Sequence, residues 1–255
     1  MDIDWKKWML AIVCAGNIVI ANAQLDSVLI DTSMHSIVEP SFFKKAIIPA
    51  AFITYGGISL GSRGLKQFDR YVNNSTIGSH GYNGSIDDYL RYGPIAAVYG
   101  LDLLGIKAKH HFVDRSAMLL ISMALTSTAV TFTKKNIHRE RPDGSSFSSF
   151  PSSHTAMAFM AAEFMNQEYG KKSVWFSVIG YGTATATGVL RLYHHVHWLS
   201  DVIMGAGYGI LTTKLSYLIY PYLKQIFVPK NNAYIVLSPI LYGSYPGCSV
   251  VLKLR

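Results

Sequence analysis

The sequence contains little charge and almost no cysteine. Only 15% of its 255 residues are charged and two are cysteines, Cys14 and Cys248, whereas 50% are hydrophobic. Two cysteines do not provide a disulfide framework, and no His, Cys and carboxylate pattern completes a zinc site. A Lys/Arg-rich tail, a nucleic-acid-binding helix motif and a Gly-aromatic RNA motif are also missing, which argues against a nucleic-acid partner.

The charge that is present is mostly positive and is confined to short segments. The net charge is +8 and the sequence pI is about 9.3, which favours anionic partners such as phosphates or acidic lipid head groups. The basic residues form small clusters between apolar segments, as on the loops of a membrane protein: "FKKA", "KAKHH", "TKKNIHRER" and "YGKKS". The mean hydropathy of +0.23 is high for an average soluble protein.

The N-terminus has the organisation of a secretory signal peptide. Lys6 and Lys7 precede an apolar run over 9–20, and Ala21-Asn22-Ala23 is a small-x-small cleavage site. We predict that residues 1–23 are a signal peptide cleaved after Ala23, with an uncleaved anchor as the alternative. Cleavage would leave Cys248 as the only cysteine and would exclude an intrachain disulfide.

Apolar segments over residues 24–230 predict one helical domain that is largely embedded in a membrane. Residues 116–133 and 173–190 carry no charge and reach the length that spans a bilayer, while 46–61, 93–106 and 154–168 are shorter. Residues 198–223 predict a further long helix, and the polar stretch 62–92 predicts a long loop with one short helix. The alternative is that these segments are the core helices of a soluble all-α protein.

The last 25 residues differ in pattern from the rest of the chain. Residues 231–255 include "AYIVLSPILYGSYPGCSVVLKLR", in which β-branched and aromatic residues alternate on both sides of "GSYPG". This alternation is typical of a β-hairpin. We predict a C-terminal hairpin or tail after the helical domain.

Three polar segments fall at the ends of the apolar helices. Lys134 and Arg141 lie in "KKNIHRERP", His154 begins the helix in "SSFPSSHTAMAFM", and the third segment is "RLYHHVHWLSD" with its Arg, His and Asp six and then four residues apart. A bundle would bring these ends together. Cations can then neutralise the equatorial oxygens of a phosphoryl group, one histidine can attack phosphorus, another can protonate the leaving oxygen, and a carboxylate can orient the nucleophile.

In this order the three segments resemble the signature motifs of the type 2 phosphatidic acid phosphatase superfamily, and the motifs cover residues 134–201. That superfamily includes lipid phosphatases, bacterial non-specific acid phosphatases and vanadium haloperoxidases. The resemblance implies an all-α bundle of the six-helix type. It also implies that His197 is a nucleophile that becomes a phosphohistidine, that Asp201 holds the other ring nitrogen of His197, and that His154 protonates the leaving alkoxide and later activates water.

The resemblance further implies a phosphate cradle that needs no metal ion or other cofactor. Its members are cationic or hydroxyl side chains and N–H groups at the start of a helix: Lys134, Arg141, Ser152, Ser153 and Arg191. Two positions differ from the usual motif, because Ser153 stands where glycine is common and Leu190 where serine is common. Leu190 removes one hydrogen bond to phosphate, worth about 1–2 kcal/mol. We interpret His138, His194 and His195 as loop histidines.

The sequence therefore predicts a metal-independent phosphatase of a lipid-linked phosphomonoester or diphosphate, with membrane and phosphorylated lipid as its partners. Lipid A phosphate, a polyprenyl diphosphate and phosphatidylglycerol phosphate all fit. We expect the bacterial inner membrane with a periplasm-facing site, and the alternative is a soluble periplasmic non-specific acid phosphatase. A haloperoxidase is a weaker alternative because those proteins are much larger.

The predicted membrane topology contains a conflict. After cleavage at Ala23 the chain begins in the periplasm, so three crossings over 46–61, 93–106 and 116–133 would place Lys134 in the cytoplasm. A periplasmic site requires that one segment does not cross. We expect that segment to be the one around Asp102, because a lone carboxylate is costly in lipid.

Overall fold

The computed structural model describes residues 40–76, 86–227, 234–242 and 245–253, and within them the predicted all-α fold is confirmed. Six long helices and two shorter ones follow one another before two strands. The helices are α2 (Pro40–Gly61), α3 (Arg63–Ser75), α4 (Ile86–Leu90), α5 (Gly93–Leu103), α6 (Phe112–Asn136), α7 (Ser153–Tyr169), α8 (Val174–Tyr193) and α9 (Leu199–Phe227).

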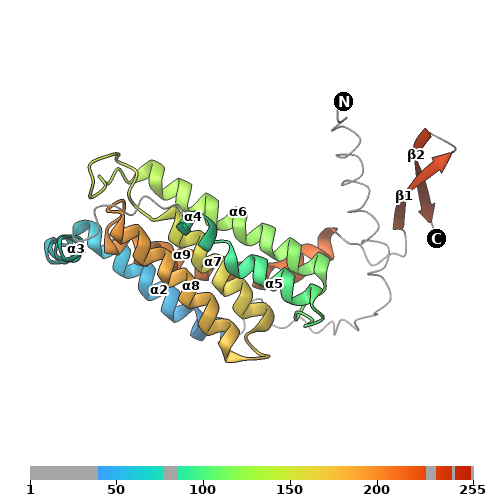
Figure 1. Cartoon of the computed structure of the whole chain (residues 1–255), viewed down its shortest axis with the longest axis horizontal. Coiled ribbons are helices and arrows are strands. Elements are labelled where there is room, and N and C mark those ends of the chain that lie inside the picture. Colours follow the sequence, from blue (N-terminus) through green and yellow to red (C-terminus); the bar gives the residue numbers. More distant parts are fainter. Residues whose placement is uncertain (1–39, 77–85, 228–233, 243–244, 254–255) are drawn as a thin grey trace. The chain divides into compact units, whose positions relative to one another are not determined.

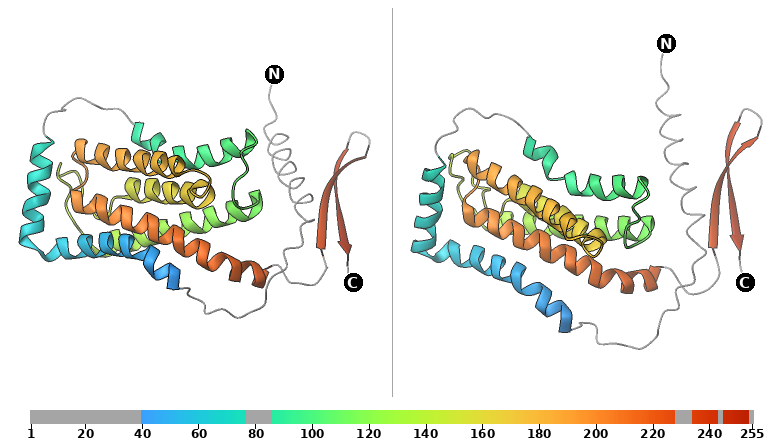
Figure 2. Two further views of the ribbon diagram at one scale, coloured as in Figure 1. Left: turned by 90° about the horizontal axis from the view of Figure 1, so that it is seen from below. Right: turned by 60° about the horizontal axis from the view of Figure 1, so that its bottom comes forward.

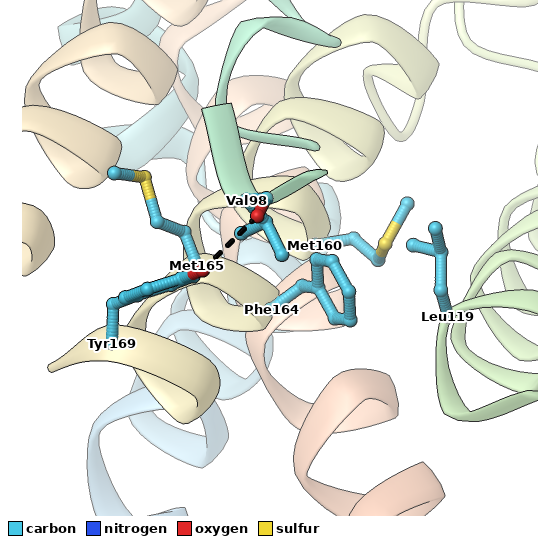
Figure 3. Packing of buried hydrophobic residues seen from close by; sticks show 6 residues of the cluster. All are labelled: Val98, Leu119, Met160, Phe164, Met165 and Tyr169. Atoms are coloured by element: carbon cyan, nitrogen blue, oxygen red, sulfur yellow. Dashed lines mark hydrogen bonds between the residues drawn. The ribbon is translucent and has the colours of Figure 1, made fainter. Parts of the chain in front are cut away.

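Helix α7 lies at the centre of the bundle and packs against α5, α6 and α8 (Figure 1). Its side chains are buried around most of its circumference, as expected of a helix surrounded by others. The core beside it combines Met160, Phe164 and Tyr169 of α7 with Val98 of α5 and Leu119 of α6 (Figure 3). The hydroxyl of Tyr169 donates to the carbonyl oxygen of Val98 at 3.2 Å, so α5 is fixed to α7 by a polar contact as well as by packing.

Glycines allow α9 to approach α7 at backbone distance. A Cβ atom on Gly209 would lie 2.2 Å from the carbonyl oxygen of Ala156, and one on Gly205 would lie 2.6 Å from that of Ser152. Both separations are far below contact distance, so only glycine fits. This close approach places the beginning of α9 directly beside the beginning of α7.

Hydroxyl side chains link α6 and α9 along their length. Ser122 and Ser216 hydroxyls are 2.5 Å apart, those of Thr126 and Thr212 are 2.7 Å apart, and Thr133 contacts the hydroxyl of Tyr208 at 2.9 Å. Such interhelical hydrogen bonds are typical of helices that pack in an apolar medium. They hold the C-terminal end of α6 against α9.

The surface of the helical bundle is unusually apolar. Phe43, Ile47, Leu120, Phe132 and Trp175 are each at least 64% exposed although they lie within long helices. Among the described helices, α6 and α9 are long and apolar enough to cross a membrane, with mean hydropathies of 1.5 and 1.3. Helix α8 has the predicted length but is not among the described helices that meet the length and hydropathy expected of a membrane span.

The described parts of the polar stretch 62–92 contain two helices, where a long loop with one short helix was predicted. Ser62 caps the 13-residue helix α3, which lies across one end of the bundle (Figure 2), and α4 follows before α5 begins. The sequence did not predict the full extent of α3, because this helix has a polar surface and little continuous apolar character. Its buried residue is an acid, Asp69, rather than a hydrophobic side chain.

The structure also corrects the expectation for the segment around Asp102. This carboxylate is not alone, because Arg115 Nη2 donates to Asp102 Oδ2 at 2.7 Å. Moreover, α4 lies at one end of the bundle and α6 begins at the other, so the chain travels the length of the bundle between them. The segment around Asp102 therefore belongs to a helix that returns the chain to the start of α6.

The two strands form an antiparallel hairpin. Strand β1 (Tyr234–Tyr242) pairs with β2 (Tyr245–Lys253), with Tyr234 opposite Lys253 and Tyr242 opposite Tyr245. The predicted hairpin is thus present, and β2 already begins within "GSYPG". Tyr245, Pro246 and Gly247 already belong to β2. The predicted signal peptide, residues 1–23, lies outside the described residues.

Candidate active site

The predicted site residues lie at four helix ends that meet beside α3 (Figure 2). Because consecutive long helices run in opposite directions, the C-terminal ends of α6 and α8 lie next to the N-terminal ends of α7 and α9. Lys134 and Arg191 come from the first pair, His154 from α7, and His197 from the turn before α9. The charges of Lys134 and Arg191 both act on His197, and that of Arg191 also acts on His154.

His197 is almost completely buried, with 3% of its side chain exposed. Its Nδ1 lies 3.6 Å from Asp201 Oδ2, which is longer than a hydrogen bond, and it has no hydrogen-bond partner among the described residues. Burial lowers the pKa of His197; Asp201 opposes this shift, while Lys134 and Arg191 add to it. The ring is therefore kept neutral, which is the form that can attack an electrophile.

Asp201 is held by three donors besides its proximity to His197. Its Oδ2 accepts from the backbone N–H of Trp198 at 2.8 Å and from the hydroxyl of Ser149, and its Oδ1 accepts from Arg139 Nη1 at 2.8 Å. The carboxylate is fully buried. These hydrogen bonds fix the direction of the Asp201 carboxylate.

Arg139 is a site residue that the sequence did not reveal. Its Nη2 donates to Asp69 Oδ2 of α3 at 2.7 Å while Nη1 reaches Asp201 and the hydroxyl of Ser200. Asp69 in turn accepts from the backbone N–H and hydroxyl of Ser200. A buried acid–base–acid chain therefore connects α3 to the start of α9. The sequence does show Arg139 two positions before Arg141. Its partner Asp69, however, lies in a stretch predicted to be mostly loop.

His154 occupies the first turn of α7 and is partly exposed. Its Nε2 lies 2.7 Å from Asp88 Oδ1 of α4. Burial lowers the pKa of His154, and the hydrogen bond to Asp88 opposes that shift. Asp88 was also absent from the predicted site.

Two of the predicted phosphate-binding cations have buried N–H groups without a hydrogen-bond partner. Within the described residues, Nε of Arg141 and Nε of Arg191 have no acceptor, although a different nitrogen of Arg191 contacts Asp87. Lys134 Nζ donates to the carbonyl oxygen of Ser148 at 2.5 Å. Buried guanidinium donors without acceptors are rare, and here they favour an anionic ligand.

The two serines at the start of α7 have different environments. Ser152 is buried, its Oγ accepts from the N–H of Thr155, and its own N–H donates to the carbonyl oxygen of Asp201. The N–H of Ser152 therefore already has an acceptor within the protein. Ser153 is the first residue of α7 and is half-buried, so its N–H belongs to the group that a helix leaves without an internal acceptor. Ser153 is the better placed of the two for binding an anion.

Two of the histidines interpreted above as loop residues lie around the site rather than in it. His195 Nδ1 contacts the side-chain oxygen of Asn73 at 2.8 Å, and His138 is exposed. Ligand atoms of Asp87, Asp88 and His154 lie within 4.8 Å of one another, a spacing that a metal ion can bridge. Asp87, however, is paired with Arg191, and the arginine charge disfavours a cation at that position.

Comparison with known proteins relates the motif-bearing part of the chain to a family. Residues 115–225 match the sequence profile of the PAP2 superfamily, and every predicted site residue falls within this range. This matched range, a little under half of the chain, resembles the PAP2 superfamily. Helices α6 to α9 are therefore its PAP2 segment, whereas α2 to α5 precede the matched range.

A curated relative is the lipid A 1-phosphatase of Porphyromonas gingivalis, which is 36% identical over 141 residues. The aligned region is 55% of this chain, and the chain spans only 32% of that relative's length. A solved structure, the transmembrane PAP2-type phosphatidylglycerolphosphate phosphatase of Bacillus subtilis, superposes with a TM-score of 0.51 at 19% identity. It covers 72% of this chain and 98% of its own, which supports the same fold.

Proposed function

We propose that this protein is a metal-independent phosphatase of a lipid-linked phosphate ester. The observation that supports this proposal most strongly is the arrangement around His197. A buried, neutral imidazole lies among the charges of Lys134 and Arg191, and buried N–H groups of Arg141 and Arg191 have no acceptor within the described residues. A phosphoryl group would satisfy those donors and present its phosphorus to the imidazole.

In the first chemical step His197 attacks phosphorus in line with the leaving oxygen. The P–N bond forms as the P–O bond to the lipid breaks, and protonated His154 transfers its proton to the departing alkoxide. Lys134, Arg141 and Arg191 stabilise the negative charge on the equatorial oxygens. Asp201 lies on the Nδ1 side of the nucleophile and stabilises the positive charge that the ring gains when it is phosphorylated at Nε2.

In the second step water replaces the histidine. Neutral His154 accepts a proton from the water as its oxygen attacks phosphorus, the P–N bond breaks, and inorganic phosphate leaves. His154 is then protonated again and His197 is neutral, so the site returns to its starting state. Each proton and each bonding pair is accounted for without a metal or a redox step.

A lipid substrate is supported by the surface of the fold. The bundle exposes large apolar side chains on several helices, and α6 and α9 are long and apolar enough to span a bilayer. Such a surface is costly in water and stable in lipid. The curated relative is named a lipid A 1-phosphatase. These observations favour a membrane-embedded lipid phosphatase over the soluble periplasmic acid phosphatase.

The substrate class is tested with a panel of phosphorylated lipids in detergent micelles. We expect phosphate release from lipid A 1-phosphate, a polyprenyl diphosphate or phosphatidylglycerol phosphate, undiminished by excess EDTA. Release from the water-soluble ester p-nitrophenyl phosphate should be at least about 100-fold less efficient in kcat/KM, because remote lipid binding energy is lost. Equal turnover of the soluble ester, or recovery of the protein in the aqueous fraction after osmotic shock, would support the soluble alternative instead.

For localisation we propose an inner-membrane protein whose site faces the periplasm. Helix α2 begins at the end of the bundle opposite to α3 (Figure 2), so the site and the start of α2 at Pro40 lie toward opposite ends. A periplasmic site thus places Pro40 in the cytoplasm, which is incompatible with cleavage after Ala23 as predicted. The two predictions exclude each other, and the orientation must be measured.

Cysteine labelling on spheroplasts decides the orientation. In a chain with Cys14 and Cys248 replaced by serine, we expect Ser146→Cys near the site to react with a membrane-impermeant maleimide from outside. Lys107→Cys, exposed between α5 and α6, should react only after lysis. The reverse pattern would place the site in the cytoplasm and would be consistent with the predicted cleavage.

A further inference from the structure

Besides Asp69, two acidic side chains reach the site from outside the PAP2 segment. Asp87 and Asp88 are consecutive residues of the short helix α4, which precedes the matched range 115–225. Asp87 is 1% exposed and contacts Arg191, while Asp88 is 46% exposed and contacts His154. The two carboxylates thus contact two different members of the proposed site.

The surroundings of His154 make Asp88 its main stabilising partner. The charged groups that face His154 are Asp87, Asp88 and Arg91 from α4 and the turn after it, and Arg191 from α8. The two arginines disfavour a protonated imidazole, and Asp87 is occupied by Arg191. Asp88 is therefore the carboxylate available to favour the protonated form.

We propose that Asp88 is a positioning residue that holds His154 for its role as acid and base. This inference rests on the proposed phosphatase function. Asp88 accepts the Nε2–H of His154, which leaves Nδ1 directed away from α4 to exchange a proton with the leaving oxygen and then with water. The Nε2–H of His154 remains hydrogen-bonded to Asp88 in both steps, so the imidazole ring keeps one orientation throughout the cycle.

The pairing has a consequence for pH that a purely structural role lacks. Asp88 favours protonated His154, so removing its charge lowers the pKa of that histidine. At a pH above that pKa a smaller fraction of His154 then carries the proton needed by the leaving group. The alkaline limb of kcat/KM should move to lower pH in Asp88→Asn, with activity at pH 8 reduced about 10-fold more than activity at pH 6.

The protonation of His154 can also be measured without any enzymatic activity. Diethyl pyrocarbonate modifies neutral imidazole, and the tryptic fragment covering 140–171 contains His154 as its only histidine. At pH 5 we expect His154 in Asp88→Asn to react about 3- to 10-fold faster than in the wild-type protein, whereas at pH 8, where both are neutral, the rates should agree within about twofold. Peptide mass spectrometry of the full-length protein in detergent gives both rates.

Matched variants separate the possible outcomes. Glu140→Gln makes the same charge change on an exposed residue and should leave the pH dependence unchanged, whereas Asp88→Glu keeps a carboxylate and should restore most of it. Faster modification of Asp88→Asn at both pH values would indicate that the substitution merely makes His154 more accessible to the reagent. Unchanged modification at pH 5 would indicate that Asp88 does not affect the protonation of His154. Either result overturns the proposal. Asp88→Ser provides the same test should Asp88→Asn not fold. If no lipid phosphate is hydrolysed, the proposed function fails while the modification result still decides the pairing.

Discussion

His197→Ala is expected to abolish phosphate release, by about 10⁴-fold or more in kcat, while the protein remains folded. Removing the nucleophile of a covalent mechanism eliminates the intermediate rather than weakening a contact. Folding should persist because Asp201 keeps its bonds from Arg139, Ser149 and Trp198 when the imidazole is lost. The measurement is phosphate release from the preferred lipid, together with thermal unfolding in the same detergent.

The covalent intermediate provides a second readout for the same variant. Rapid quenching of the wild-type protein with ³²P-labelled lipid should trap a phosphoenzyme that is labile in acid and stable in base, as a phosphohistidine is, and His197→Ala should show none. His138→Ala is the matched control because His138 is exposed in the α6–α7 connection, and it should retain both label and activity. Labelling of His197→Ala at the wild-type level would refute this assignment of the nucleophile.

Arg139→Ala is expected to cause the largest loss of stability. It leaves Asp69 and Asp201, which are 1% and 0% exposed, as buried carboxylates without their cation. Breaking one side of a buried ion-pair network costs about 3–5 kcal/mol of unfolding free energy, which corresponds to a fall of about 10 °C in Tm for a chain of this size. Activity should fall by about 100-fold or more, because the turn that carries His197 loses its support.

The arginine that follows Asp69 on α3 provides the control. Arg70 is exposed, and Arg70→Ala should change the unfolding free energy by no more than about 0.5 kcal/mol. Arg139→Lys keeps the charge but not the planar fork that reaches Asp69 and Asp201 together, so its Tm should lie between those of the wild type and Arg139→Ala. A Tm for Arg139→Ala within about 2 °C of the Arg70→Ala value would show that the network does not stabilise the fold.

The linear sequence determined the helices and the order of the chemical groups. Uncharged runs such as 116–133 and 173–190 form α6 and α8. A long apolar run favours a helix through its own composition, independently of distant parts of the chain. Motif spacing was equally local: Arg191, His197 and Asp201 are separated by a helix end and one turn, so their proximity follows from the chain itself. These features are readable because each depends on neighbours within a few residues.

The tertiary structure decided which distant residues support the site. Asp69 of α3 contacts Arg139, and Asp88 of α4 contacts His154, across sequence separations of 70 and 66 residues. Both acids lie in a stretch that the sequence presented mostly as polar loop. No local pattern specifies such pairings, because they depend on how α3 and α4 lie over the end of the bundle. The same is true of Ser152, whose place before the helix predicted a phosphate ligand but whose N–H is taken by Asp201. A motif therefore located the reacting histidines, while the packing of α3, α4 and α9 determined what holds each of them, since a buried charge must find its partner in three dimensions.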